Sequence, residues 1–332
     1  MSKQWILDGL NCANVNREQM EKTLRGKVHA LNCTSVRPYA SLADCLVQLE
    51  TVRAAIAAMD DLALVARSVA DIENAVRTNR VGIILGTQDS TMIEENTALL
   101  ASMKELGIRI LQPNYNTPNR YACGAPQTGP EDTGMTEAGA EWLEEMHRLQ
   151  LVVDLSHCGH RSTSDFIAAS PGRPLIASHA NAYAVCPSPR NKTDDHLRGI
   201  AETGGLTGAV MWTPAVRHDQ QPDMDDYINH VDHMVKVAGI DHVGFASDTP
   251  ESPATEPEKW DRTFGPNGTN QNITGILGDW FIYENRMNKD FQSLSHTPRV
   301  WEGLDRRGYK EDAIEKIMHG NWLRVLKEIW GE

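Results

Sequence analysis

Short apolar runs rich in β-branched residues alternate with segments of helical periodicity along most of this 332-residue chain. We expect strands at 4–8, 28–34, 81–86, 108–113, 151–155, 174–178, 206–212 and 242–246. We expect helices at 42–58, 91–106, 136–149, 161–169, 194–203 and 224–238. Strands that alternate with helices form parallel sheets through right-handed crossovers. Eight such units in a chain of this length favour an α/β fold of the (β/α)8 TIM-barrel type.

An open, doubly wound sheet has the same alternation, but no glycine-rich phosphate loop follows any expected strand. After Asp248 the alternation stops. Residues 249–297 are rich in Pro, Gly, Asn and aromatic side chains and lack a clear period. We expect an insertion over the barrel mouth after the eighth strand, with a surface excursion of no role as the alternative. Residues 298–330 return to helical spacing, so we expect a single barrel domain over 1–332 that ends in helices.

Acidic residues outnumber basic ones and give the chain a net charge of -13. Such a field repels phosphate backbones and anionic lipids, so we expect no nucleic-acid partner. No apolar run approaches the ~18 residues that a membrane span needs. The first residues also lack the apolar core of a signal peptide. We therefore expect a cytoplasmic protein without membrane contact, whose six cysteines are reduced thiols.

Polar side chains follow the expected strands at the end where a barrel carries its active site. His157 and His179 follow neighbouring strands, each directly after a serine, and Asp248 follows the eighth strand. Imidazole suits zinc and similar metals, and a nearby carboxylate suits a general base. A lone histidine after a strand is more often structural, but the repeated Ser-His ending favours a functional interpretation. The pattern indicates metal-assisted hydrolysis.

Several short segments, spread over nearly the whole chain, carry a further pattern. They are Leu7-Asp8-Gly9, Gly107-Ile108-Arg109, Tyr115-Asn116, Val153-Asp154-Leu155-Ser156-His157, Ala177-Ser178-His179, Pro189-Arg190-Asn191 with Asp194-Asp195, Asp241-His242-Val243-Gly244 through Asp248, and Gly320-Asn321-Trp322-Leu323-Arg324-Val325-Leu326. Together, and in this order, they resemble the renal (membrane) dipeptidase family, which is peptidase family M19 of the amidohydrolase superfamily.

The resemblance implies an amidohydrolase-like barrel that holds two zinc ions bridged by a carboxylate and cleaves dipeptides. His157 and His179 match the two histidine ligands of one metal. Asp248 matches the carboxylate that orients the attacking hydroxide and takes its proton. Arg190 matches the arginine that binds the terminal carboxylate of the substrate, a task that suits a guanidinium. Tyr115-Asn116 is close to the form that bacterial members carry, and we expect both residues at the substrate.

The chain departs from the family pattern at three metal ligands. The family opens with Asp-Gly-His-Asn-Asp, whereas this chain has Leu10 and Cys12 in place of the two ligands of that run. Gln88 replaces the bridging glutamate, and a neutral amide does not offset the charge of two dications. We therefore expect at most one zinc ion, held by His157, His179 and one of Cys12, Gln88 or Asp248. A thiolate is a good zinc ligand, but a small buried residue is an equal alternative for Cys12. A metal-free site is the remaining option.

Three functions stay open at this point. The first is a hydrolase that cleaves a dipeptide or a similar small amide bearing a carboxylate, with one metal in a reduced site. The second is a repurposed barrel that acts on a non-peptide small molecule, since three ligands have changed together. The third is a pseudoenzyme that uses Arg190 to bind an anionic ligand. The resemblance also implies a homodimer.

Overall fold

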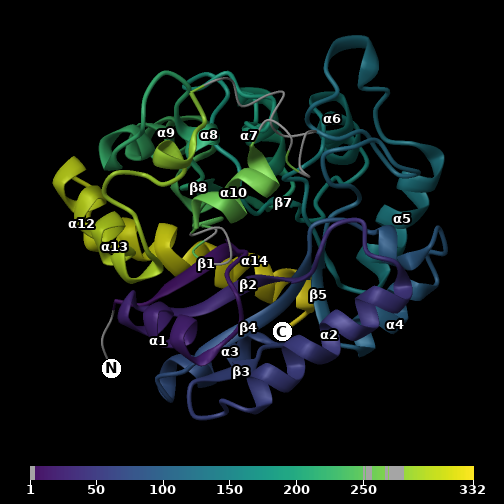
Figure 1. The fold of residues 1–332 in the computed structure, drawn as a ribbon. Coiled ribbons are helices and arrows are strands. Elements are labelled where there is room, and N and C mark those ends of the chain that lie inside the picture. The colour runs from purple at the N-terminus through teal and green to yellow at the C-terminus, as the bar shows by residue number, and fades with distance from the viewer. Residues whose placement is uncertain (1–3, 250, 252–255, 266–267, 269–279) are drawn as a thin grey trace.

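Eight parallel strands curl into an amidohydrolase-like TIM barrel with helices on its outside (Figure 1). The computed structural model describes residues 4–249, 251, 256–265, 268 and 280–332. The barrel strands are β1 (Ile6–Asn11), β2 (Val28–Val36), β4 (Val81–Thr87), β5 (Ile108–Leu111), β6 (Val152–Val153), β7 (Ile176–Ala177), β8 (Leu206–Val210) and β9 (Val243–Ala246). All eight coincide with the strands expected from the sequence.

The barrel consists of two hydrogen-bonded groups of strands. Strands β1, β2, β4, β5 and β6 form the first group in that order, and β7, β8 and β9 form the second. The groups meet at two places, which we call the β6–β7 seam and the β9–β1 seam. A single parallel bridge between Asp154 and Ile176 joins the first seam. At the second seam, the backbone N–H of Asp248 donates to the Leu10 carbonyl at 3.0 Å.

The helices follow the strands in the order that the alternation predicts. They are α1 (Arg17–Arg25), α2 (Leu42–Ala57), α3 (Val69–Arg77), α4 (Leu99–Glu105), α5 (Glu137–Arg148), α6 (His160–Ala168), α7 (Asp194–Glu202), α8 (Thr213–Val216) and α9 (Met224–Ala238). Helix α9 shows why they form: Asp223 caps its first turn by accepting from the Asp226 N–H, and Gly239 ends it at a φ of 89°. Its buried face packs on the barrel through Ile228 and Val231.

The C-terminal segment is helical, as the sequence predicts. It contains α12 (Pro298–Arg307), α13 (Glu311–Glu315), a π-helical turn at Lys316–Gly320 and α14 (Asn321–Trp330). The indole of Trp322 on α14 is buried against glycines of three barrel strands, Gly9, Gly208 and Gly244. A side chain at Gly244 would come within 2.5 Å of that indole. Helix α14 therefore belongs to the barrel core, where it packs with one apolar residue from each of several strands.

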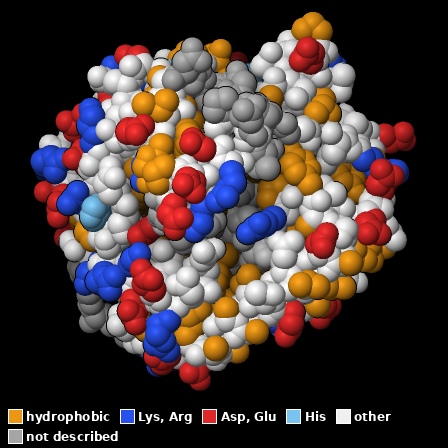
Figure 2. Space-filling model, in the orientation of Figure 1, with side chains coloured by type: hydrophobic (Ala, Val, Ile, Leu, Met, Phe, Trp, Pro, Cys, Tyr) orange, Lys and Arg blue, Asp and Glu red, His pale blue; other side chains and the backbone are white. Residues whose placement is uncertain are grey.

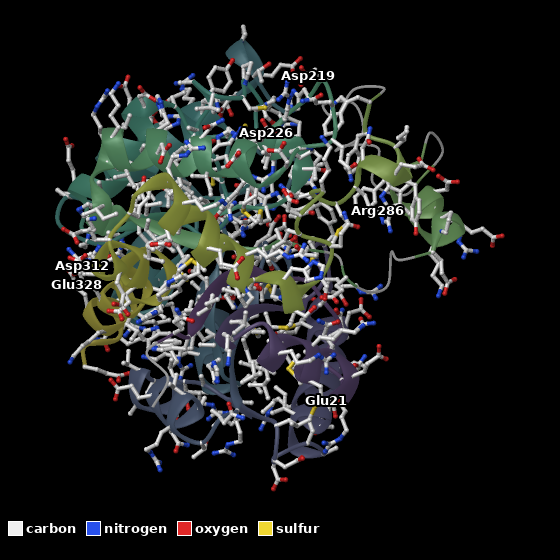
Figure 3. All side chains as sticks on the ribbon, turned by 90° about the vertical axis from the view of Figure 1, so that its left-hand side faces the viewer. Glu21, Asp219, Asp226, Arg286, Asp312 and Glu328 are labelled. Carbon is white, nitrogen blue, oxygen red and sulfur yellow. The ribbon has the colours of Figure 1, made fainter. Side chains whose placement is uncertain are left out.

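Residues 249–297, expected as an insertion over the barrel mouth, lie partly outside the described residues. Their described part contains α10 (Pro257–Phe264) and an aromatic cluster in which Trp260 and Phe281 pack against Tyr115 and Trp212. Figure 3 shows α10 and the labelled Arg286 together on one side of the molecule. The Arg286 guanidinium lies 3.5 Å from the centre of the Tyr283 ring. This part of the segment therefore packs around aromatic side chains, whereas Phe291 and Leu294, further along the segment, are buried in the main core.

Candidate active site

The β6–β7 seam is held by the buried carboxylate of Asp154. Its Oδ1 accepts from the backbone N–H groups of Ser156 and Ser178, at 3.0 and 2.9 Å, and from the Ser156 hydroxyl at 2.5 Å. Its Oδ2 accepts from the Ser178 hydroxyl at 2.6 Å and from the Gln112 amide at 2.8 Å. Five donors thus converge on one carboxylate. They fix the backbone directly before His157 and His179, the residues that follow the two serines.

A second buried carboxylate, Asp8, holds the β9–β1 seam in the same way. It accepts from the Ser247 backbone N–H at 2.7 Å, from the Ser247 hydroxyl at 2.5 Å and from the Asn11 amide at 3.1 Å. Burial raises the pKa of Asp8 to about 6, although these hydrogen bonds oppose the rise. Asp248, the residue that follows Ser247, has a φ of 41°. Aspartate tolerates this left-handed region better than most residues, and such backbone is frequent at functional sites.

The two imidazole rings meet at their Nε2 atoms, which are 3.0 Å apart. The Nε2 of His157 also lies 2.9 Å from the Gln88 Oε1 atom. Burial and the neighbouring Arg190 guanidinium lower the pKa of both rings well below the ordinary value. Both rings are therefore neutral at physiological pH, and each carries a single N–H.

Hydrogen bonds on the far side of each ring decide where that N–H lies. The Nδ1 of His157 faces the Asn116 Oδ1 acceptor at 2.7 Å. The Nδ1 of His179 lies 2.7 Å from the Ser178 hydroxyl, whose own hydrogen goes to Asp154. Both Nδ1 atoms are thus donors, and both Nε2 lone pairs point at each other. Together with the Gln88 oxygen, this places three acceptors around the His157 Nε2, an arrangement typical of a cation site with oriented ligands.

Two buried cations come from the segment before α7. Arg190 donates through Nη2 to the His157 Nε2 at 3.2 Å and through Nη1 to the Ser156 carbonyl. Lys192 is fully buried and donates to the Leu155 and Cys158 carbonyls at 2.7 and 3.1 Å. Burial lowers the pKa of Lys192 to about 8. The turn that carries His157 is therefore held on both sides by positive charge.

Asp248 and Cys12 form a pair at the end of the β9–β1 seam. Burial raises the pKa of Asp248 to about 7, against the opposing effects of Arg190 and of a hydrogen bond from the Cys12 thiol. Burial, then the Asp248 charge, raises the pKa of Cys12 well above the ordinary value, so it remains a thiol. A carboxylate whose pKa lies near 7 can take up and release a proton at physiological pH, which suits a general base.

Tyr115 covers the His157 ring by stacking on it, with ring centres 4.1 Å apart. Its other neighbours are Tyr39, at 5.8 Å in an edge-on contact, and the aromatic cluster around Trp260. Together with Cys12 and Gln88, Tyr115 also lines a cavity of about 720 Å³. The candidate site therefore adjoins a cavity large enough for a small molecule.

The family model for membrane dipeptidase, peptidase family M19, matches residues 12–262, which is more than half of the chain. The chain belongs to this family. An uncharacterised dipeptidase of Schizosaccharomyces pombe is 29% identical over 259 residues, which cover 73% of this chain and 61% of that protein. The M19 family therefore places the chain among the hydrolases.

Comparison with solved structures supports the barrel fold described above. An amidohydrolase from Pseudomonas aeruginosa superimposes with a TM-score of 0.88 at 28% identity, over 99% of this chain and 97% of that one. A metallopeptidase from Rhodobacter sphaeroides, solved with a phosphinate mimic of the dipeptide L-Ala-D-Ala, superimposes with a TM-score of 0.79 at 22% identity. The match covers 98% of this chain and 99% of that one.

The zinc chemistry of M19 relatives can be tested against the side chains present here. Three residues replace family ligands: Leu10 is apolar and 2% exposed, Gln88 is neutral, and the Cys12 thiol donates a hydrogen bond to Asp248. Among the residues that the structure describes, no three His, Cys, Asp or Glu side chains are grouped to hold a metal. This side-chain set does not fit two ions. The two Nε2 acceptors and the Gln88 amide oxygen do fit one ion, provided that the Arg190 guanidinium, which donates to the His157 Nε2, moves off that nitrogen.

The structure brings most sequence-predicted site residues together. His157 contacts five of them, namely His179, Gln88, Arg190, Tyr115 and Asn116, and Asp248 pairs with Cys12 nearby. The sequence analysis missed the residues that position this set, namely Asp8, Asp154 and Lys192. One signal could have pointed to the two carboxylates, which bind these serines: three strand ends share a serine directly before the candidate residue, at 156–157, 178–179 and 247–248.

Proposed function

We propose that this M19 member hydrolyses the amide bond of a dipeptide or a similar small amide that bears a free carboxylate, with one zinc ion at the site. The proposal rests on the cluster of two neutral imidazoles and an amide oxygen. The Nε2 atoms of His157 and His179 are 3.0 Å apart, and the Gln88 Oε1 lies 2.9 Å from the His157 Nε2. His157, His179 and Gln88 would hold the metal. A divalent ion held there supplies Lewis-acid polarisation of the scissile carbonyl.

The chain's own residues supply the remaining steps. Arg190 binds the substrate carboxylate through its guanidinium, which orients the amide beside His157. Ionised Asp248 takes a proton from water as the water oxygen bonds to the carbonyl carbon. The same proton then passes to the amide nitrogen as the carbon–nitrogen bond breaks. The products are a carboxylic acid and an amine, which in a dipeptide are two amino acids.

Aromatic residues of the 249–297 segment form part of the substrate wall in this proposal. Trp260 and Phe281 pack in one cluster with Tyr115, which stacks on His157. The arrangement supports an insertion over the mouth of a single barrel domain. Among the described residues, no helix is long and apolar enough to cross a bilayer. A cytoplasmic location and a homodimer stay predictions from the sequence.

Metal stoichiometry tests the proposal directly. We expect one zinc ion per chain in the wild-type protein after dialysis, and a large loss of zinc in His157→Ala and His179→Ala. His242→Ala is the matched control, because His242 lies at the start of β9, at the opposite end of the barrel from His157. Elemental analysis and titration calorimetry measure the stoichiometry. Two ions per chain, or none, would contradict the assignment.

Cys12→Ala separates the two interpretations of the thiol. Because the hydrogen bond from Cys12 lowers the pKa of Asp248, its removal should raise that pKa. The acidic limb of the pH profile of kcat/KM should therefore move to higher pH, while zinc binding is retained. Loss of zinc in this variant would instead identify Cys12 as a metal ligand.

A further inference from the structure

The cavity of about 720 Å³ lies between the ends of β1 and β2 and the helix α2. At its inner end it is lined by Cys12, Gln88 and Tyr115. These three side chains contact Asp248 or His157, which places that end at the reaction centre. Arg190, which binds the carboxylate of the leaving amino acid in the proposed function, is not among the lining residues. The cavity is therefore suited to the acyl half of the substrate.

Charge distinguishes this cavity from the rest of the molecule. Among the described residues that line it, Arg37 is the one with a charged side chain. The chain as a whole has a net charge of -13, and acidic and basic side chains are mixed over the face in Figure 2. A cavity wall with a guanidinium and without a carboxylate favours an anionic occupant.

The backbone around Arg37 is fixed by neighbouring side chains. Its N–H donates to the Gln48 Oε1 atom on α2 at 2.8 Å. Two residues later, the Tyr39 N–H donates to the buried Asp89 carboxylate at 2.7 Å, which holds Tyr39 at a φ of 65°. Within the described part of the chain, no ion pair involves the Arg37 guanidinium. The arginine is thus attached to a built turn and keeps its donors for a ligand.

We propose that the substrate is an amino acid acylated by a dicarboxylic acid, an inference that rests on the proposed function. Arg190 binds the carboxylate of the amino acid, and Arg37 binds the far carboxylate of the acyl group. A free α-ammonium is disfavoured in the acyl half, because Gln88 is neutral and no carboxylate lines the cavity. Water adds to the amide carbonyl carbon, the carbon–nitrogen bond breaks, and the nitrogen gains a proton. A dicarboxylate and a free amino acid leave.

Matched acyl groups test this inference. The probes are N-succinyl- and N-glutaryl-alanine, with N-butyryl- and N-pentanoyl-alanine as analogues of equal chain length that lack the far carboxylate, each with L- and D-alanine. Because the Arg37 side chain is exposed at the cavity, we expect at least one diacid derivative to exceed its analogue about three- to fivefold in kcat/KM, the upper range for one exposed ion pair. In Arg37→Gln this ratio should fall close to one, and Arg37→Lys should restore part of it.

Arg53→Gln is the control, because it removes a cation of α2 that does not line the cavity, and it should keep the wild-type ratio. Calorimetric binding of the same probes separates the two proposals. If a diacid derivative binds more tightly than its analogue, and Arg37→Gln removes the difference, the inference is supported. That support holds even if no probe is hydrolysed, a result that would refute the proposed hydrolase activity. Hydrolysis of all probes without preference, or a preference that survives Arg37→Gln, would overturn the inference and leave the hydrolase standing. Absence of both binding and hydrolysis would overturn both.

Discussion

Replacing Asp248 with Asn should lower kcat/KM for amide hydrolysis by roughly 10²–10⁴-fold, the range that one general base contributes. Asn has the same size but cannot accept the proton of the attacking water. In the wild-type protein, kcat/KM should fall as the pH drops through about 7, because protonation of Asp248 removes the base. Asp219→Asn is the control, since Asp219 is an exposed partner of Arg217. An Asp248→Asn variant with wild-type turnover would eliminate the mechanism.

The stability of the same variant gives an independent measurement. The folded state raises the pKa of Asp248 from 3.8 to about 7, so between these values the folded chain binds more protons than the unfolded chain. Proton binding by Asp248 therefore stabilises the folded wild-type chain. This stabilisation is complete below about pH 4 and is lost as the pH rises through 7. At pH 8, Asp248→Asn should be more stable than wild type by on the order of 2–4 kcal/mol. Denaturant unfolding at pH 4 and pH 8 should show the difference shrink at the lower pH.

Removal of the Asp154 carboxylate should destabilise the fold more than any other single change at the site. In Asp154→Ala, five buried donors lose their acceptor, and each buried group left without a partner costs about 1–3 kcal/mol. Because the two serine hydroxyls can partly pair with each other, we expect a net loss of about 3–5 kcal/mol. The free energy of unfolding from denaturant titration measures it.

Two further variants make the Asp154 result specific. Asp154→Asn keeps the volume and one acceptor oxygen, so its loss should be smaller than that of Asp154→Ala. Asp61→Asn removes a carboxylate from an exposed ion pair with Arg17 and should change the unfolding midpoint little. If Asp154→Asn and Asp61→Asn were equally stable, the carboxylate would not hold the seam.

The strands were predictable because each is a buried, apolar run that stands out from its flanks, as Val81–Thr87 does. Strand β3 (Ala63–Val65) was missed, since three residues are too few to show a pattern. It pairs with β4 outside the barrel path. The expected helix at 91–106 is shorter in the structure, because Glu94 and Glu95 adopt positive φ and α4 begins only at Leu99. Tertiary contacts decide where a helix begins, and a local sequence pattern does not contain them.

At the candidate site, the sequence predicted the residues that the structure brings together around His157, but not those that position them. His157 and His179 could be predicted because each follows a strand directly after a serine, and because imidazole has a specific chemistry. Asp154 was visible only as part of a motif, since its role depends on donors up to 42 residues away along the chain. The same holds for Lys192, because two of its three acceptors are backbone carbonyls that any residue could supply.

The two seams have a consequence for hydrogen exchange. The amide hydrogens of Ser156, Ser178 and Ser247 are bonded to side-chain carboxylates, not to carbonyls of a neighbouring strand. Their protection therefore reports on the closure of the barrel at its two joints, separately from the sheets between them. An exchange experiment that follows these three amides would show whether the neighbouring His157, His179 and Asp248 move with the sheets or with the joints.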